Sequence, residues 1–227
     1  MPQAAPESPL TAEGLWEQIL VPFDAASPTP ALFLDRDGVI VEEVGFLKHP
    51  KNVRIIAGAA GVIAQANRLG LAVVIVSNQS GIGRGLFDWN DFARVQARIL
   101  AAMAAHGAVI NGVFACPHHP EAAPPYRHPD HPARKPGPGL LLRAAECLPI
   151  DLARSWIVGD RASDLAAGRN AGLAGGVLVA TGFGGPATER QAALHLAAGS
   201  RFRVLIADAI GDVAATLPLF SDHRFDL

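Results

Sequence analysis

Two aspartates separated by a single arginine follow the short apolar run at residues 31–34. Carboxylates this close repel each other, and they are costly to bury without a positive partner. In an extended segment, side chains two residues apart point the same way, so Asp35 and Asp37 can face one pocket while Arg36 turns aside. One carboxylate can attack phosphorus, and the other can move a proton to or from oxygen. The pair indicates phosphoryl chemistry beside a cation; the alternative for this motif alone is a solvated turn.

Further polar residues follow other apolar runs. Asp160 ends the run at 155–160 and is the expected second carboxylate ligand of Mg²⁺, which prefers oxygen. Asp164 can cap a helix that starts near residue 163, and we expect it behind the metal, holding Lys135 or a metal-bound water. Lys135 can offset the negative charge of both a phosphate and Asp35. Arg134 offers a planar fork to a second anionic group, although both cations could also be surface charges.

The segment SNQSGIGRG at residues 77–85 is suited to holding an anion. It supplies the Ser77 hydroxyl, the Asn78 amide and glycines that let backbone N–H groups approach phosphate oxygens. Arg84 could reach an anionic substrate or stay solvated. Taken alone, the segment is equally compatible with a glycine-rich loop that binds nothing.

Apolar strands alternate with helical patterns along the chain, which predicts an α/β fold with a mainly parallel sheet. The expected strands are residues 31–34, 71–77, 112–116, 155–160, 175–180 and 203–207, and the expected helices are 58–70, 89–106, 139–148 and 163–171. Residues 1–30 are interpreted as an extension with a helical turn, and 31–220 as one domain with a His- and Pro-rich loop at 116–138. Parallel sheets place their sites beyond the carboxyl ends of the strands, where the polar residues above lie.

Composition excludes several classes of protein. Half of the 227 residues are apolar and the formal net charge is −2, so a sizeable core is available and no nucleic-acid-binding field is expected. Two cysteines are too few for a disulfide framework. The start of the chain lacks a signal-peptide pattern, and no run of 18 apolar residues indicates a membrane span. We expect a monomeric cytoplasmic protein.

The motifs, in this order, resemble the haloacid dehalogenase superfamily of phosphatases, and the resemblance covers about residues 31–181. Within that superfamily, FLDRDGVI, VSNQSGIGRG, CPHHP, RKPGPG and VGDRASD look like the D-glycero-D-manno-heptose-1,7-bisphosphate 7-phosphatases, with the histidinol-phosphate phosphatases as near relatives. The implied fold is Rossmann-like, with helices flanking the sheet and no large cap domain.

The resemblance also implies roles for individual residues. Asp35 would be the nucleophile and Asp37 the general acid and base, while Ser77 and Lys135 would hold the phosphoryl group. Mg²⁺ would be bound by Asp35, the Asp37 backbone carbonyl and Asp160, with Asp164 behind it. Arg134 would recognise the substrate, a small sugar phosphate, in a pocket lined by Glu43, Val44, Gly45, Phe46, Ser77, Asn78, Gln79 and Ser80.

One departure concerns a structural zinc loop that the family often carries, with a Cys-x-His pair and, about a dozen residues later, a Cys-x-Cys pair. Cys116 and His118 match the first pair, but the second is replaced by His131 and Ala133. Structural zinc needs four N or S ligands. Either His119, His128 or a water completes a rebuilt site, or the loop packs without metal around a small buried Cys116.

Three functions are therefore compared. The first is a magnesium-dependent phosphatase that cleaves the 7-phosphate of the heptose bisphosphate through an aspartyl-phosphate. The second keeps this chemistry and changes the substrate to histidinol phosphate or another small phosphomonoester, because fold and motif do not settle the substrate. The third is a non-catalytic binding module, which would be expected to have lost the nucleophile or the lysine.

Overall fold

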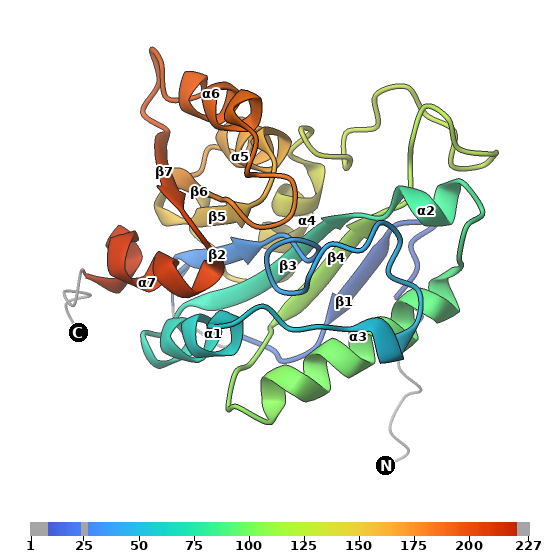
Figure 1. The fold of residues 1–227 in the computed structure, drawn as a ribbon, viewed down its shortest axis with the longest axis horizontal. Coiled ribbons are helices and arrows are strands. Elements are labelled where there is room, and N and C mark those ends of the chain that lie inside the picture. The colour runs from blue at the N-terminus through green and yellow to red at the C-terminus, as the bar shows by residue number, and fades with distance from the viewer. Residues whose placement is uncertain (1–8, 24–26, 222–227) are drawn as a thin grey trace.

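The computed structural model describes residues 9–23 and 27–221, and within them the chain is built around one seven-stranded sheet (Figure 1). In spatial order its strands are β1 (Trp16–Ile19), β4 (Gly112–Cys116), β3 (Ala72–Asn78), β2 (Ala31–Leu34), β5 (Trp156–Gly159), β6 (Gly175–Val179) and β7 (Arg203–Ala207). All neighbouring strands are parallel except β1, which runs antiparallel to β4. The predicted α/β fold with a mainly parallel sheet is confirmed.

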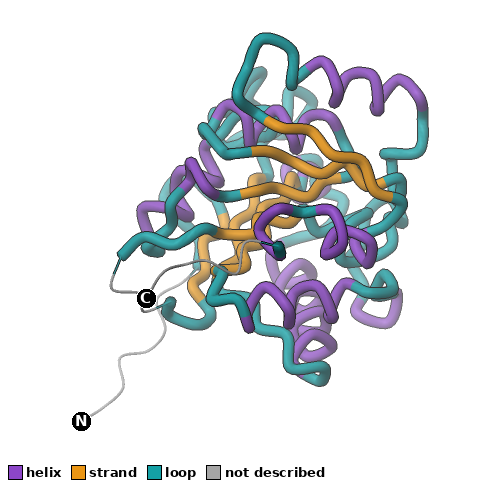
Figure 2. Tube along the Cα trace, turned by 90° about the vertical axis from the view of Figure 1, so that its left-hand side faces the viewer, coloured by secondary structure: helices purple, strands orange, loops and turns teal. Residues whose placement is uncertain are grey.

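Helices lie on both sides of the sheet, whose strands are orange in Figure 2. One face packs against α1 (Ala59–Arg68), α3 (Trp89–Ala104) and α7 (Val213–Thr216). The other packs against α4 (Gly139–Cys147), α5 (Ala162–Asn170) and α6 (Ala187–His195). Residues of β2 alternate between these two cores: Leu32 and Leu34 join the first, whereas Ala31 and Phe33 join the second. Burial on both faces explains why the central strands read as continuous apolar runs.

The chain order places a crevice at the centre of the sheet. From β2 the chain builds β3 and β4 on one side, and then returns to add β5, β6 and β7 on the other side. The carboxyl ends of β2 and β5 therefore meet where the winding direction reverses, which is where open α/β sheets bind their ligands. Asp35 follows the first of these strands and Asp160 follows the second.

The predicted helical turn near residue 16 is wrong, because Trp16–Ile19 form the edge strand β1. Leu15 and Trp16 are buried, whereas Ile19 is exposed. Pairing with β4 satisfies backbone groups along one side of this segment, and the Trp16 ring packs edge-on against Phe92 of α3 at 5.1 Å between centroids. The strand pairing and the ring contact together outweigh the helical spacing of the apolar residues. The remainder of the predicted 1–30 extension that falls on residues 1–8 and 24–26 lies outside the described residues.

Short pieces complete the fold. The loop after β3 contains the helix α2 (Ser80–Gly83), which the sequence analysis did not predict. Helix α3 begins with a reciprocal cap, in which the Asp88 side chain accepts from the Asp91 N–H at 2.8 Å and the Asp91 side chain accepts from the Asp88 N–H. Among the described residues, no segment between strands forms a cap domain, as predicted. None of the described helices combines the length and apolarity that crossing a bilayer requires.

Candidate active site

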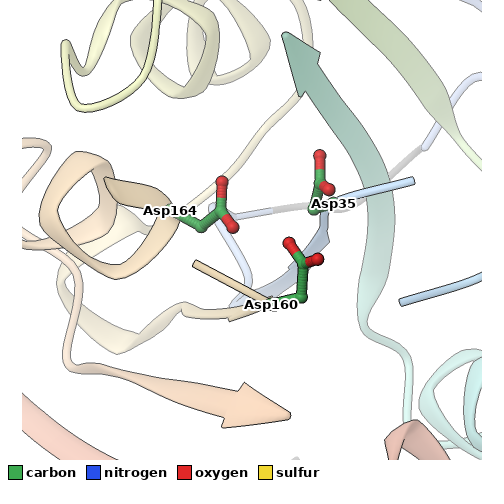
Figure 3. Close-up of side chains that lie close together, drawn as sticks. All are labelled: Asp35, Asp160 and Asp164. Carbon is green, nitrogen blue, oxygen red and sulfur yellow. The ribbon is translucent and has the colours of Figure 1, made fainter. Parts of the chain in front are cut away.

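Three buried carboxylates converge at the crevice (Figure 3). Asp35 follows β2, Asp160 follows β5 and Asp164 lies in the first turn of α5, and one oxygen from each lies within 4.8 Å of the others. Lys135 reaches them from the loop before α4. Its Nζ lies 2.7 Å from Asp35 Oδ1 and 2.8 Å from Asp164 Oδ1, and it also donates to the Val76 carbonyl. The structure brings together these four residues, which the sequence predicted from three separate motifs.

The charge of this cluster is unbalanced, since one lysine faces three carboxylates. Burial, together with Asp164 and the neighbouring aspartates, raises the pKa of Asp35 to about 8, although Lys135 acts in the opposite direction. Burial and Asp164 raise the pKa of Asp160 to about 7. Burial alone would lower the pKa of Lys135, but Asp164 and Asp35 raise it above its ordinary value. The carboxylates of Asp35 and Asp160 can each supply one oxygen ligand, and the cluster has an excess of negative charge. Both features fit a hard divalent cation such as Mg²⁺.

Without magnesium, the protein is expected to lose stability as the pH rises from about 4 to about 8. The folded-state pKa of Asp35 and of Asp160 lies above the unfolded value, so the folded protein holds protons that the unfolded chain has already released. Adding Mg²⁺ at pH 8 should restore the loss, because the ion takes the place of those protons. Thermal unfolding from pH 5 to 8, with and without Mg²⁺, measures this; a flat profile without metal would contradict it.

Asp164 does not cap its helix in the way the sequence suggested. Helix α5 starts at Ala162 after Arg161, and neither Ser163 nor Asp164 is the N-cap residue. Asp164 instead sits at the third helical position, where its Oδ2 accepts from the Arg161 N–H at 3.0 Å. Its other oxygen is left for Lys135. The helix start therefore fixes the carboxylate that orients the lysine, in agreement with the expectation that Asp164 holds Lys135.

Two glycines pack directly on the carboxylate of Asp160. Gly38 and Gly182 both have positive φ, and a Cβ at either position would lie 2.3 and 2.1 Å, respectively, from Asp160 Oδ2. The same oxygen accepts from the Phe183 N–H at 2.8 Å. The loops after β2 and β6 thus close around one oxygen of Asp160 and fix the direction of its carboxylate. A larger side chain at either glycine would displace it.

Asp35 and Asp37 face one pocket as expected, but the expectation that Arg36 turns aside is wrong. The Arg36 guanidinium is buried and forms an ion pair with the neighbouring carboxylate, with Nη2 at 2.8 Å from Asp37 Oδ2. It lines the pocket together with Asp35 and Asp37. The chain turns at Gly38 immediately after the motif, so the segment is not extended and the alternation of side chains does not apply.

The last two residues of β3 have different partners: Ser77 faces the pocket, and Asn78 binds the loop that carries Lys135. Ser77 is buried and lines the pocket. Asn78 clamps the backbone of Lys135: its Nδ2 donates to the lysine carbonyl and its Oδ1 accepts from the lysine N–H, both at 3.1 Å. The Asn78 amide therefore fixes the loop that carries Lys135 against the end of β3.

A cavity of about 600 Å³ opens above this cluster. Glu43, Gly45, Phe46, Ser80 and Arg134 line it, as predicted for substrate-binding residues, whereas Val44 does not and is half exposed. Lining residues that the sequence analysis missed include Leu47, Phe87, His119, Arg161 and Phe183. Arg161 follows Asp160 directly, so its position was a usable signal, and its guanidinium lies 3.7 Å from the centre of the Phe183 ring. Phe87 and Phe183 carried no such signal.

The histidine-rich loop does not have the geometry of a zinc site. His118 and His131 stack face to face, with centroids 3.8 Å apart and planes at 1°. Nitrogen lone pairs lie in the plane of an imidazole ring, so two parallel rings cannot direct them at one tetrahedral ion. Cys116 is buried, and this burial raises the pKa of its thiol to about 11. Among the described residues, the aspartate cluster alone brings three ligand atoms within 4.8 Å.

We therefore expect His131→Phe, which keeps an aromatic ring but removes the Nδ1 that accepts from the Ala133 N–H at 3.1 Å, to lose no more than about 1 kcal/mol. His131→Ala should lose about 1 kcal/mol more, or about 2–4 °C further in Tm, because the stack on His118 is lost as well. The purified protein should contain no stoichiometric zinc and should resist 1,10-phenanthroline. One zinc per chain, lost in His131→Phe together with stability, would contradict this account.

Comparisons with known proteins agree with this geometry. A family model described as HAD-hydrolase-like, where HAD denotes haloacid dehalogenase, matches residues 132–200. A Mesorhizobium japonicum protein named D-glycero-beta-D-manno-heptose-1,7-bisphosphate 7-phosphatase is 44% identical over 171 residues, which cover 75% of this chain and 79% of that protein.

Two solved structures are similar to this one. A HAD-like phosphatase from Mesorhizobium loti has 43% identity and a TM-score of 0.74, covering 76% of this chain and 83% of its own. The D,D-heptose 1,7-bisphosphate phosphatase of B. bronchiseptica, solved with magnesium and phosphate, has 32% identity and a TM-score of 0.69, covering 83% and 98%. With its buried aspartates at the strand ends and these relatives, the chain belongs to the haloacid dehalogenase superfamily and is an enzyme of its phosphatase branch.

Proposed function

We propose that the protein hydrolyses the 7-phosphate of D-glycero-β-D-manno-heptose 1,7-bisphosphate, using Mg²⁺ and an aspartyl-phosphate on Asp35. The observation that carries the proposal is the pairing of Asp35 with Lys135 on the floor of the cavity, beside Asp160. The relative that is 44% identical is named for this activity. A binding module that had lost catalysis would not be expected to keep both the nucleophile and the lysine.

The reaction divides between two carboxyl groups. An oxygen of Asp35 attacks phosphorus and the bond from phosphorus to the sugar oxygen breaks, while Asp37 gives its proton to that oxygen. A water molecule then attacks phosphorus and gives a proton to Asp37, and the bond from phosphorus to Asp35 breaks, releasing inorganic phosphate. Ser77 and Lys135 hold the phosphoryl oxygens during both steps.

The metal would be held by Asp35, the backbone carbonyl of Asp37 and Asp160, with Asp164 behind them. When bound, Mg²⁺ supplies positive charge to the phosphoryl oxygens and to the carboxylates that surround them. This ion would also favour the ionised, nucleophilic form of Asp35, whose pKa is otherwise raised to about 8.

The rest of the substrate would lie against the loop at Glu43–Phe46 and against Arg134. Arg134 is held at the pocket because its Nη1 donates to the His118 carbonyl at 3.1 Å. We assign it to the second phosphate, since a guanidinium binds such oxygens in a planar fork. The stack of His131 on His118 then supports the residue whose carbonyl holds Arg134 at the pocket.

Phosphate release from heptose 1,7-bisphosphate, histidinol phosphate and p-nitrophenyl phosphate, with and without Mg²⁺, tests the proposal. We expect magnesium-dependent release with the highest kcat/KM for the heptose bisphosphate. A preference for histidinol phosphate, or equal values for all three, would retain the chemistry and overturn the substrate. Release that does not depend on Mg²⁺ would overturn the metal site.

We also propose that the enzyme works as a monomer in the cytoplasm. Residues of a single chain fill every role assigned above at the cavity, and Cys116 and Cys147 are free thiols, as expected in a reducing compartment. Light scattering on the purified protein tests the first point: a dimer mass would overturn it. Cell fractionation tests the second, and recovery outside the cytoplasmic fraction would overturn it.

A further inference from the structure

A buried network joins Ser77 to Asp37 through the side chain of Gln79. The Gln79 Nε2 donates to Ser77 Oγ at 2.8 Å and to Asp37 Oδ2 at 2.9 Å. Its Oε1 accepts from Arg36 Nη2 at 3.1 Å. Gln79 is 4% exposed and Arg36 is 1% exposed, so neither is a solvated side chain that happens to lie near the site.

Arg36 determines which way the Gln79 amide faces. A guanidinium has only donors, so the atom of Gln79 that meets it must be the carbonyl oxygen. The amide NH₂ is then forced toward Ser77 and Asp37. Because that NH₂ occupies a lone pair of the Ser77 oxygen, the hydroxyl must send its own proton elsewhere, and the open direction is the cavity that Ser77 lines.

The two carboxylate oxygens of Asp37 accept different numbers of hydrogen bonds from Arg36 and Gln79. Oδ2 accepts from Arg36 Nε at 3.0 Å, from Arg36 Nη2 at 2.8 Å and from Gln79 Nε2. Oδ1 accepts one longer contact, from Arg36 Nη2 at 3.1 Å. Three donors saturate the lone pairs of Oδ2, so a proton on this carboxyl group belongs on Oδ1.

We propose that Gln79 and Arg36 are positioning residues: they pin Oδ2 of Asp37, leave Oδ1 as the oxygen that exchanges the proton, and aim the Ser77 hydroxyl at the phosphoryl group. The inference rests on the roles proposed above for Asp37 and Ser77. It gives Gln79 a role other than the substrate contact expected from the sequence.

Phenyl phosphate and p-nitrophenyl phosphate separate this role from a structural one. Phenolate is the poorer leaving group and depends more on a well-placed acid, whereas p-nitrophenolate leaves with little help. In single-turnover experiments Gln79→Met should slow phenol release about 30-fold and p-nitrophenol release less than about 3-fold, within the range that general acids supply. KM should stay near the wild-type value, since the substrate contacts remain.

Two further variants keep the test sharp if Gln79→Met is unstable. Gln79→Leu has a similar volume but can neither accept from Arg36 nor donate to Ser77 or Asp37, and it should show the same selective loss. Arg36→Lys keeps the charge without the fork and should reproduce the effect in part. Gln96→Met, at a buried glutamine that does not line the cavity, should leave the ratio of the two rates unchanged.

Equal losses on both esters would overturn the positioning of Asp37, because only the acid distinguishes the two leaving groups, and no loss on either ester would overturn the positioning role altogether. Failure of the proposed function gives a different result: the wild type would then release no phosphate, or Asp35→Asn would remain active. A wild type that hydrolyses both esters and a Gln79 variant with an unchanged ratio would reject the inference alone.

Discussion

The Asp35→Asn variant is expected to lose phosphate release by at least about 10⁴-fold, because an amide oxygen does not replace a carboxylate as the nucleophile. The same variant should be more stable than the wild type at pH 8 without magnesium. Burial raises the pKa of Asp35 to about 8. At pH 8 the folded wild type must therefore either bury the charged carboxylate or keep a proton that the unfolded chain has released, and both lower the free energy of unfolding. Asparagine has the same shape, can still accept from Lys135 and carries no charge.

Urea unfolding at pH 5 and pH 8 measures this gain, and it should be larger at pH 8, by about 1 kcal/mol or more. Mg²⁺ should stabilise the wild type more than the variant, which has lost one anionic ligand. Asp208→Asn, at an exposed aspartate outside the cavity, is the matched control and should change neither quantity. Retained turnover in Asp35→Asn would reject the nucleophile, and reduced stability at pH 8 would reject the excess of negative charge.

The cluster of Asp35, Asp160, Asp164 and Lys135 was predictable because the topology of the sheet, and not the detailed packing of side chains, brings it together. Strand ends of a parallel sheet meet at one rim, so polar residues after β2, β3 and β5 had to lie near one another. The pairing of Lys135 with Asp35 and Asp164 could be predicted from the charges of these residues. The strands themselves were readable since burial on both faces imposes long runs of β-branched residues, such as AVVIV in β3.

The predictions that differ from the structure concerned local geometry, which residue types alone do not encode. Arg36 was expected to point away because an extended segment was assumed, yet the chain turns at Gly38 and the guanidinium folds back onto Asp37. Trp16 lies in a strand because it pairs with β4 and contacts Phe92, although its spacing to the neighbouring apolar residues is helical. The His118–His131 stack is likewise invisible in sequence, where two histidines read equally well as ligands.

Lys135→Met is expected to impair both folding and catalysis, because this lysine is the cation that balances Asp35 and Asp164. Its side chain is 1% exposed, and removing it leaves two buried carboxylates without their partner. Breaking a buried ion pair in this way costs about 3–5 kcal/mol. Losing a donor to the phosphoryl group should lower kcat by about 10²–10³-fold in addition.

The two effects can be separated with a second substitution. In Lys135→Met/Asp164→Asn the unpaired charge of Asp164 is gone, so stability should recover in part while activity stays low. The penalty of the single variant should also shrink at pH 5, where Asp35 is protonated, and shrink at pH 8 when Mg²⁺ is added. Lys51→Met, at an exposed lysine, supplies the control for the loss of a surface charge. Unfolding and phosphate release are measured on all three variants. Full stability of Lys135→Met at pH 8 without metal would mean that the carboxylates do not depend on this lysine. A double variant that regains stability but not turnover would show that Lys135 stabilises the fold through its charge and serves the reaction as a hydrogen-bond donor.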